Sequence, residues 1–287
     1  MFLLPSEPQS IFQLIRNIYH VFIKSFISVL PLMILMCIAI TILSFFANSA
    51  TFHLQSGIFN LSNKSIVIFD LICFFVVFII YGAIYFRTYN IIYDRPASFW
   101  SALYIGIKKV IPVLIAAIIT LFVLALIVLA ICVPFFIALH FMTMNLPTIW
   151  PFQQILAGPR IEIFALITIV LAYFFAAVLL LFYFALIVVD NLNPFVAFTR
   201  SCYLVWGHWW HAASIVGILY FIFPPLLFLL QWYFVYYLPA PHLTALNTWI
   251  AAISVQNLVS LFYVPIYISA VLVMLHDLKI RKHVAVP

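Results

Sequence analysis

The stretch that decides the fold is IPVLIAAIITLFVLALIVLAICVPFFIA, residues Ile111–Ala138, which contains no charged residue. An α-helix rises 1.5 Å per residue, so about 20 apolar residues cross the hydrocarbon core of a membrane. The stretch is continuously apolar rather than apolar at alternate positions, which excludes a strand of a transmembrane barrel. We therefore expect a membrane-spanning helix here.

The composition extends this interpretation to the whole molecule. Of the 287 residues, 68% are hydrophobic and only 6% are charged. Soluble domains carry about 25% charged residues, and a chain with so few could not cover a water-facing surface with polar groups. The sequence therefore predicts an all-α integral membrane protein. Its four cysteines have no C-x-x-C spacing, which argues against a metal cluster or a disulfide framework.

Six segments are long and apolar enough to cross a bilayer. They are Phe26–Phe46, Ile66–Phe86, Ile111–Ala138, Ile163–Val189, Ala212–Leu238 and Trp249–Leu275. An even number of spans leaves both termini on one side of the membrane. Of the twelve Lys and Arg residues, only Lys64 and Arg160 fall on the other side. Because cytoplasmic loops carry an excess of basic residues, we expect both termini in the cytoplasm.

Three shorter stretches precede the first, third and fifth spans, and their polar residues recur at helical spacing. They are Pro8–Lys24, Pro96–Lys109 and Pro194–His211, and each begins with a proline, which suits the first turn of a helix. The pattern is typical of amphipathic helices that lie in the membrane interface. We therefore expect three helical-hairpin repeats, over residues 8–93, 94–192 and 193–275, in a single membrane domain of residues 1–287. Residues 276–287 are expected to form a cytoplasmic tail.

Two of these units resemble known families. Residues Ala97–Leu121, ASFWSALYIGIKKVIPVLIAAIITL, and Asn193–Leu219, NPFVAFTRSCYLVWGHWWHAASIVGIL, resemble the surface-helix-plus-span units of the YciC-like bacterial inner-membrane proteins. They are also similar to the membrane domain attached to some glycerophosphodiester phosphodiesterases. Ser201, with Arg200 before it and Leu204 after it, matches the R-S-x-x-L core of the unit. The resemblance implies the inner membrane and a six-span fold rather than a chemistry, and it carries over no phosphodiesterase activity.

Basic residues and tyrosines form the first candidate site. Tyrosines recur every four residues, from Tyr81 to Tyr93, at the inner end of the second span. Hydroxyl groups beside a guanidinium suit a lipid headgroup, although the same residues also suit an ordinary interfacial belt. Basic residues of the second and third surface helices could reach lipid phosphates. The headgroup candidates are Tyr85, Arg87, Tyr89, Lys108, Lys109 and Arg200.

A pair of amides lies inside the sixth predicted span. Gln256 and Asn257 are roughly 12 Å from its start near Trp249, at 1.5 Å per residue. An amide in lipid seeks a hydrogen-bond partner, so the pair either lines a substrate pathway or bonds one helix to another. The sequence leaves both alternatives open.

The unit HWWH places His208 and His211 three residues apart on one helical face, where both could ligate zinc. A zinc site needs three or four protein ligands, and Cys202 is the only further ligand close in the sequence. The alternative is two interfacial imidazoles that flank an aromatic anchor. We favour the anchor and expect neither a metal nor a cofactor.

Sequence patterns of catalysis are missing: there is no G-x-S-x-G, H-E-x-x-H or phosphate loop. We therefore expect no enzyme, but a lipid-interacting or membrane-organising accessory protein of the inner membrane. Membrane lipids are the expected partners, and a membrane-protein partner or a homo-oligomer stays open. The alternative function is transport of a small solute or lipid through polar residues of spans five and six. The net charge of +6 follows from cytoplasmic loops and gives no reason to expect nucleic acid.

Overall fold

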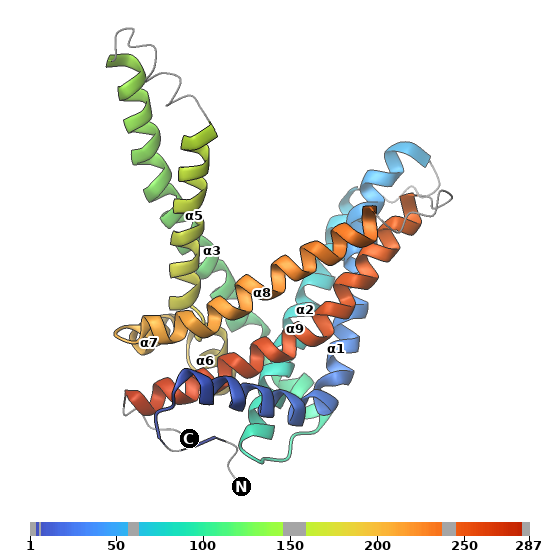
Figure 1. Ribbon diagram of the computed structural model, residues 1–287. Helices are drawn as coiled ribbons and strands as arrows, with labels where there is room; N and C mark the ends of the chain where they lie inside the picture. Colours follow the sequence, from blue (N-terminus) through green and yellow to red (C-terminus); the bar gives the residue numbers. More distant parts are fainter. Residues whose placement is uncertain (1–3, 6, 57–62, 146–158, 237–244, 283–287) are drawn as a thin grey trace.

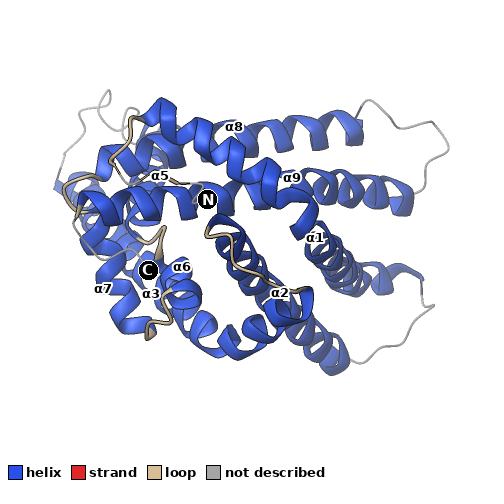
Figure 2. Ribbon diagram, turned by 90° about the horizontal axis from the view of Figure 1, so that it is seen from below, coloured by secondary structure: helices blue, strands red, loops and turns tan. Residues whose placement is uncertain are grey.

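The computed structural model describes residues 4–5, 7–56, 63–145, 159–236 and 245–282, and these residues are almost entirely helical (Figure 1). The helices are α1 (Ile11–Ser56), α2 (Asn63–Ile92), α3 (Phe99–Asn145), α5 (Pro159–Leu179), α6 (Tyr183–Val189), α7 (Pro194–Val205), α8 (Trp209–Tyr236) and α9 (Ala245–Arg281). Within the described ranges there is no strand (Figure 2). The all-α prediction is confirmed.

The long helices form two arms that diverge from a shared base (Figure 1). One arm contains α3 and α5, and the other contains α1, α2 and α9. Helix α8 starts beside α7 at the base and rises along α9. We call the base the basal end: it holds the beginnings of α1, α3 and α8, the ends of α2, α5 and α9, and the short helices α6 and α7. The long helices alternate in direction between the basal end and the tips of the arms.

The hydrophobic core lies near the basal end, where the arms meet. Some of its largest fully buried side chains come from α2 and from the segment around α6, among them Tyr85, Phe182 and Tyr183. Further along the arms, by contrast, large apolar side chains such as Leu121 of α3 and Leu171 of α5 are more than 60% exposed. Exposed apolar surface of this extent requires a lipid solvent. The chain is therefore an integral membrane protein.

Five helical stretches of the described residues are long and apolar enough to cross a membrane. They are Ile11–Ile42, Leu71–Ile92, Phe99–Ala130, Val170–Val189 and Val255–Arg281. The described apolar part of α8, Trp209–Leu219, is shorter. The multi-pass prediction is confirmed, but the helix ends differ from it. Most notably, α9 continues to Arg281 rather than ending at Leu275, so the predicted tail of residues 276–287 begins inside a helix. Residues 283–287 lie outside the described residues.

Two of the three predicted surface helices are continuous with the spans that follow them. Nothing between Lys24 and Phe26, or between Lys109 and Ile111, breaks a helix, and α1 and α3 each run through the expected boundary. The first part of α1 runs across the basal end before the helix bends into its arm (Figure 1). Pro31 lies inside α1, and an interior proline removes a backbone hydrogen bond and bends a helix. Only α7 is a separate helix, which ends at Val205 and not at His211, ahead of Gly207 with its φ of +86°.

Side chains cap the beginnings of these three helices. At α1, the Ser10 hydroxyl accepts from the backbone N–H of Gln13, while the Gln13 side chain accepts from the Ser10 backbone N–H at 2.9 Å, which forms a capping box. Ser98 caps α3 by accepting from the Ser101 N–H, and Asn193 caps α7. Only Pro194 occupies the first helical turn as predicted. Pro8 and Pro96 lie before the capping serines, outside their helices.

Asp94 and Asn191 turn the chain after α2 and α6, and both have a φ near +55°. At each turn, an N–H just beyond the left-handed residue bonds back across the last helical turn: Arg95 to the Asn90 carbonyl at 2.8 Å, and Leu192 to the Leu186 carbonyl at 3.4 Å. The bond from Arg95, together with that from the Asp94 N–H to the Ile91 carbonyl, is the pattern of a Schellman cap, whereas the bond from Leu192 spans one residue more. Asp and Asn tolerate the left-handed region better than other non-glycine residues. The two turns direct α3 and α7 across the basal end.

The fourth predicted span, Ile163–Val189, is broken into α5 and α6. The sequence Leu179–Tyr183 contains no glycine or proline, so local propensity does not explain the break. Instead, the buried Ser201 of α7 donates a hydrogen bond of 2.7 Å to the Leu179 carbonyl. That bond satisfies a carbonyl oxygen at the end of α5. The R-S-x-x-L motif therefore has a structural role, since Ser201 and Leu204 are both fully buried.

Candidate functional site

Four polar residues meet around one buried carboxylate at the basal end: Gln9, His211, Asp277 and Arg281, which we call the basal ion cluster. Asp277 is only 2% exposed. Its Oδ2 accepts from Nε of Arg281 at 2.7 Å and from Nε2 of His211 at 3.1 Å, and its Oδ1 accepts from the Gln9 backbone N–H at 2.8 Å. Arg281 also donates to the Gln9 carbonyl. One carboxylate thereby joins α8, α9 and the segment that precedes α1.

A second contact fastens the N-terminal segment beside this cluster. The Tyr93 hydroxyl lies 3.0 Å from Nδ1 of His276, and Nε2 of His276 lies 3.1 Å from the Pro5 carbonyl oxygen. A carbonyl only accepts, so Nε2 carries the hydrogen and Nδ1 accepts from the tyrosine. Burial raises the pKa of the Tyr93 hydroxyl, which keeps it protonated and able to donate. The neutral imidazole therefore bridges the end of α2 to the N-terminal segment.

A third contact is an ion pair between α9 and the end of α6. Nζ of Lys279 lies 2.7 Å from Asp190, and Lys279 is only 4% exposed. Breaking a buried ion pair leaves an uncompensated charge, which is strongly destabilising. Together with the basal ion cluster, this pair fixes the position of α9 relative to α6 and α8. The arrangement compensates its charges internally, so we assign it a structural role.

The sequence missed these contacts because their partners are far apart along the chain. Asp277 and His211 are separated by 66 residues, and Lys279 and Asp190 by 89. Only the Asp277–Arg281 spacing of four residues, typical of a pair on one helical face, could have indicated the cluster. His211 pairs with Asp277 rather than with His208. Among the described residues, no group of three or more His, Cys, Asp or Glu side chains could hold a metal ion.

The two headgroup candidates with a hydroxyl lie inside the protein. Tyr85 is 1% exposed and Tyr89 is buried in the same core. The guanidinium of Arg95, rather than that of Arg87, lies over the Tyr89 ring, at 6.0 Å from its centre. Nε and Nη1 of Arg87 are buried and have no hydrogen-bond partner among the described residues. A headgroup would have to enter between helices to reach Tyr85, so this role stays a prediction.

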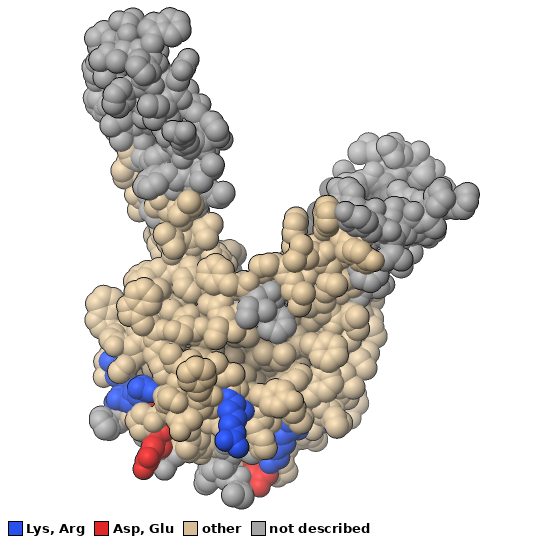
Figure 3. All heavy atoms as spheres, viewed as in Figure 1, with Lys and Arg blue, Asp and Glu red and all other residues tan. Residues whose placement is uncertain are grey.

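The basic candidates of α3 and α7 lie closer to the surface. Lys108 is exposed, while Lys109 is half-buried and donates to the Asn191 side chain in the turn before α7. Arg200 is half-buried on α7. Figure 3 shows the Lys and Arg side chains of the visible face gathered at the basal end, well below the described parts of the arms. Their role as headgroup ligands is a prediction that the geometry leaves open.

Exposed aromatic side chains occupy the same level as these cations. They belong to the first three turns of α1, the first two turns of α3, α7, the α7–α8 turn and the start of α8, and each is more than half exposed: Phe12, Tyr19, Trp100, Tyr104, Phe195, Tyr203, Trp206 and Trp210. We call the eight residues from Phe12 to Trp210 in this series the basal aromatic belt. Two of them, Trp206 and Trp210, also line an open pocket of about 500 Å³ with Trp209 of α8 and with Phe175 and Leu179 of α5. Aromatic rings that project outward beside cations are typical of a membrane–water interface.

The amide pair of the sixth predicted span is divided between two environments. Asn257 donates from Nδ2 to the Thr41 hydroxyl of α1 at 2.6 Å, and the Cys37 thiol lies 3.6 Å from the Asn257 carbonyl oxygen. Gln256 is exposed. Asn257 therefore bonds α9 to α1, as expected of an interhelical contact.

Comparisons with known proteins add no relative to this description: no family model, no curated protein and no solved structure matches the chain.

Proposed function

We propose that this protein is a six-span, non-enzymatic protein of the bacterial inner membrane, with cytoplasmic termini, that interacts with anionic lipids and organises the membrane around it. The observation that carries the proposal is the basal aromatic belt, which coincides with the exposed cations. Aromatic rings prefer the interface, and Lys and Arg near an anionic leaflet each gain about 1 kcal/mol. Cytoplasmic termini are supported by the basic residues of the visible face, which gather at the basal end, where α1 begins and α9 ends.

The sixth span is the part of this proposal that depends on α8. Its 28 residues, Trp209–Tyr236, exceed the roughly 20 residues that a span needs. Fluorescent reporters that mature only in the cytoplasm, fused to either terminus in separate chains, test the number of spans. Both fusions are expected to fluoresce. A dark fusion at one terminus would mean an odd number of spans.

Lipid selectivity tests the function. Spin-labelled phosphatidylglycerol and phosphatidylcholine, compared in vesicles that contain the protein, report which lipid is preferentially immobilised at its surface. We expect a preference for phosphatidylglycerol that falls in the double variant K108Q/R200Q and declines with salt. The control K64Q/R160Q removes the same amount of charge at the beginnings of α2 and α5, the ends of these two helices that lie away from the basal end. Equal preference in all three proteins would overturn the proposal.

A further inference from the structure

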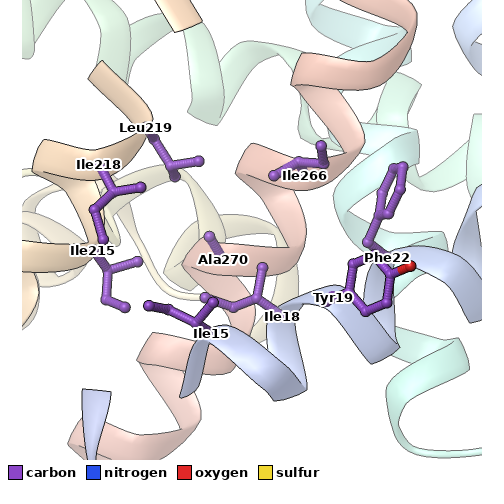
Figure 4. A pocket seen from close by; sticks show the side chains of 9 residues that line it. All are labelled: Ile15, Ile18, Tyr19, Phe22, Ile215, Ile218, Leu219, Ile266 and Ala270. Carbon is purple, nitrogen blue, oxygen red and sulfur yellow. The ribbon is translucent and has the colours of Figure 1, made fainter. Parts of the chain in front are cut away.

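A groove about 250 Å³ in volume lies between three helices near the basal end (Figure 4). Ile266 and Ala270 of α9 lie between the residues that α8 contributes on one side and those of α1 on the other. The lining residues are Ile15, Ile18, Tyr19, Phe22, Ile215, Ile218, Leu219, Ile266 and Ala270. Only Tyr19 among them carries a polar side-chain atom. The groove is therefore an apolar trough and offers nothing to a polar solute.

The groove opens outward at the depth where acyl chains begin. Ile215 is six residues beyond Trp209, about 9 Å along the helix, and Ala270 is eleven residues, about 16 Å, before Arg281. Tyr19, Ile15 and Ile218 are each at least 40% exposed, so they form an open rim. Water is excluded from this depth of a bilayer, because the hydrocarbon core begins just beneath the headgroups. The material that fills such a trough is a hydrocarbon chain.

A basic residue follows one of the groove residues directly on α1. Arg16 is exposed, lies next to Ile15 on α1, and has neither an ion pair nor a hydrogen bond to any described residue. Lys24, two turns further along, lies 3.9 Å from Asp94 and on a different side of the helix. Exposed apolar residues of α3 such as Ile118 are more than two turns from the nearest basic residue of that helix. The groove therefore has an apolar trough and, one residue from its lining on α1, an exposed guanidinium.

We propose that the groove between α1, α8 and α9 is a binding site for a single phospholipid, with one acyl chain in the trough and the phosphate paired with Arg16. The proposal rests on the function proposed above, because it requires α8 and α9 to span the membrane. The bilayer is as apolar as the trough, so the chain gains packing contacts but no hydrophobic free energy. The phosphate contact and the fit of the chain therefore supply the selectivity, and Tyr19 sits at the rim between them.

Photo-crosslinking in nanodiscs tests the site. Phosphatidylglycerol that carries a diazirine on its acyl chain is activated by light, and the labelled residues are mapped by mass spectrometry of peptides. We expect the label to concentrate on the groove residues of α1 and α8 and to be displaced by unlabelled phosphatidylglycerol. Label spread over α3, α5 and α8 in proportion to their exposure would overturn the proposal, because it would show only bulk lipid.

Two pairs of variants separate the chain from the headgroup. Ile218→Trp fills the rim and is expected to lower groove labelling at least fivefold, whereas Ile118→Trp on the exposed face of α3 should leave it unchanged. Arg16→Gln should weaken labelling without moving it, and Lys24→Gln on the same helix should not. Equal labelling in Arg16→Gln and Lys24→Gln would overturn the phosphate contact, and with it the proposal. Groove labelling should persist in K108Q/R200Q even though the surface preference for phosphatidylglycerol is lost, because neither residue lines the groove. The two measurements can therefore fail independently of each other.

Discussion

Helices α9 and α3 are both apolar and long enough to span a membrane, yet they are held in place differently. Half of the apolar window of α9 is buried in the protein, against 11% of that of α3. The end of α9 carries the buried Asp277 and Lys279, each paired with a partner on another helix. Beyond Lys109, α3 has no charged residue at all. Directional polar contacts therefore specify the position of α9, whereas α3 depends on close backbone packing near its start and on lipid along the rest.

The largest effect should follow from damage to the basal ion cluster. Asp277→Asn removes the charge that compensates Arg281, and it weakens the hydrogen bonds that His211 and the Gln9 N–H donate to this side chain. Loss of one partner from a buried ion pair costs about 3–5 kcal/mol, so we expect a large drop in the midpoint of thermal unfolding in nanodiscs. Asp94→Asn is the matched control, because Asp94 is exposed and lies 3.9 Å from Lys24. A drop of similar size in both variants would contradict the role given to Asp277.

The sequence predicted what depends on local pattern and missed what depends on distant partners. The helical class, the apolar windows and the start of α7 at Pro194 follow from residues within a turn or two of one another. The sequence predicts a solvated tail over the segment that contains His276, Asp277, Lys279 and Arg281. No residue nearby in the sequence indicates that Asp277 pairs with His211 and Lys279 with Asp190. The break after Leu179 likewise depends on Ser201, which lies 22 residues later. The headgroup candidates Tyr85 and Tyr89 follow an interfacial pattern, but the core covers them.

A smaller effect should follow from separating α3 from α2. A Cβ at Gly106 of α3 would overlap the Ile79 carbonyl oxygen of α2, so the two backbones touch there. Gly106→Ala forces the helices apart, and overpacking of this kind costs about 1–3 kcal/mol. Gly217→Ala in α8 meets only Phe174 and Phe221, at 3.8 Å, and should be neutral or stabilising, because alanine favours a helix. Thermal unfolding of both variants checks the contrast, and a Gly106→Ala variant as stable as the unmodified protein would contradict the close packing of α2 and α3.

A still smaller effect is expected at the amide pair of α9. Asn257→Leu removes the bond to Thr41, and interhelical hydrogen bonds in membranes contribute about 0.6 kcal/mol. Gln256→Leu should be neutral or slightly stabilising, since Gln256 is exposed toward a lipid solvent. Unfolding measurements distinguish the two variants. If Gln256→Leu instead abolished flux of a solute into liposomes while both proteins stayed folded, the transport alternative would replace the interhelical one.

The smallest effect concerns the turn between α7 and α8, which lies against the end of α9. Burial lowers the pKa of His208, Lys282 and Arg281 lower it further, and Asp277 opposes them less strongly. The unfolded chain therefore takes up this proton at a higher pH than the folded protein. The contribution of His208 to stability is fully present above the ordinary histidine pKa of about 6.5, and it is lost as the pH falls from there through the lowered pKa of the folded protein. His208→Gln should therefore lose less stability than the unmodified protein between pH 7.5 and about 5.5. Lys282→Met should act in the same direction by removing a positive neighbour, whereas a steeper loss in either variant would mean that α9 does not set the charge state of this turn.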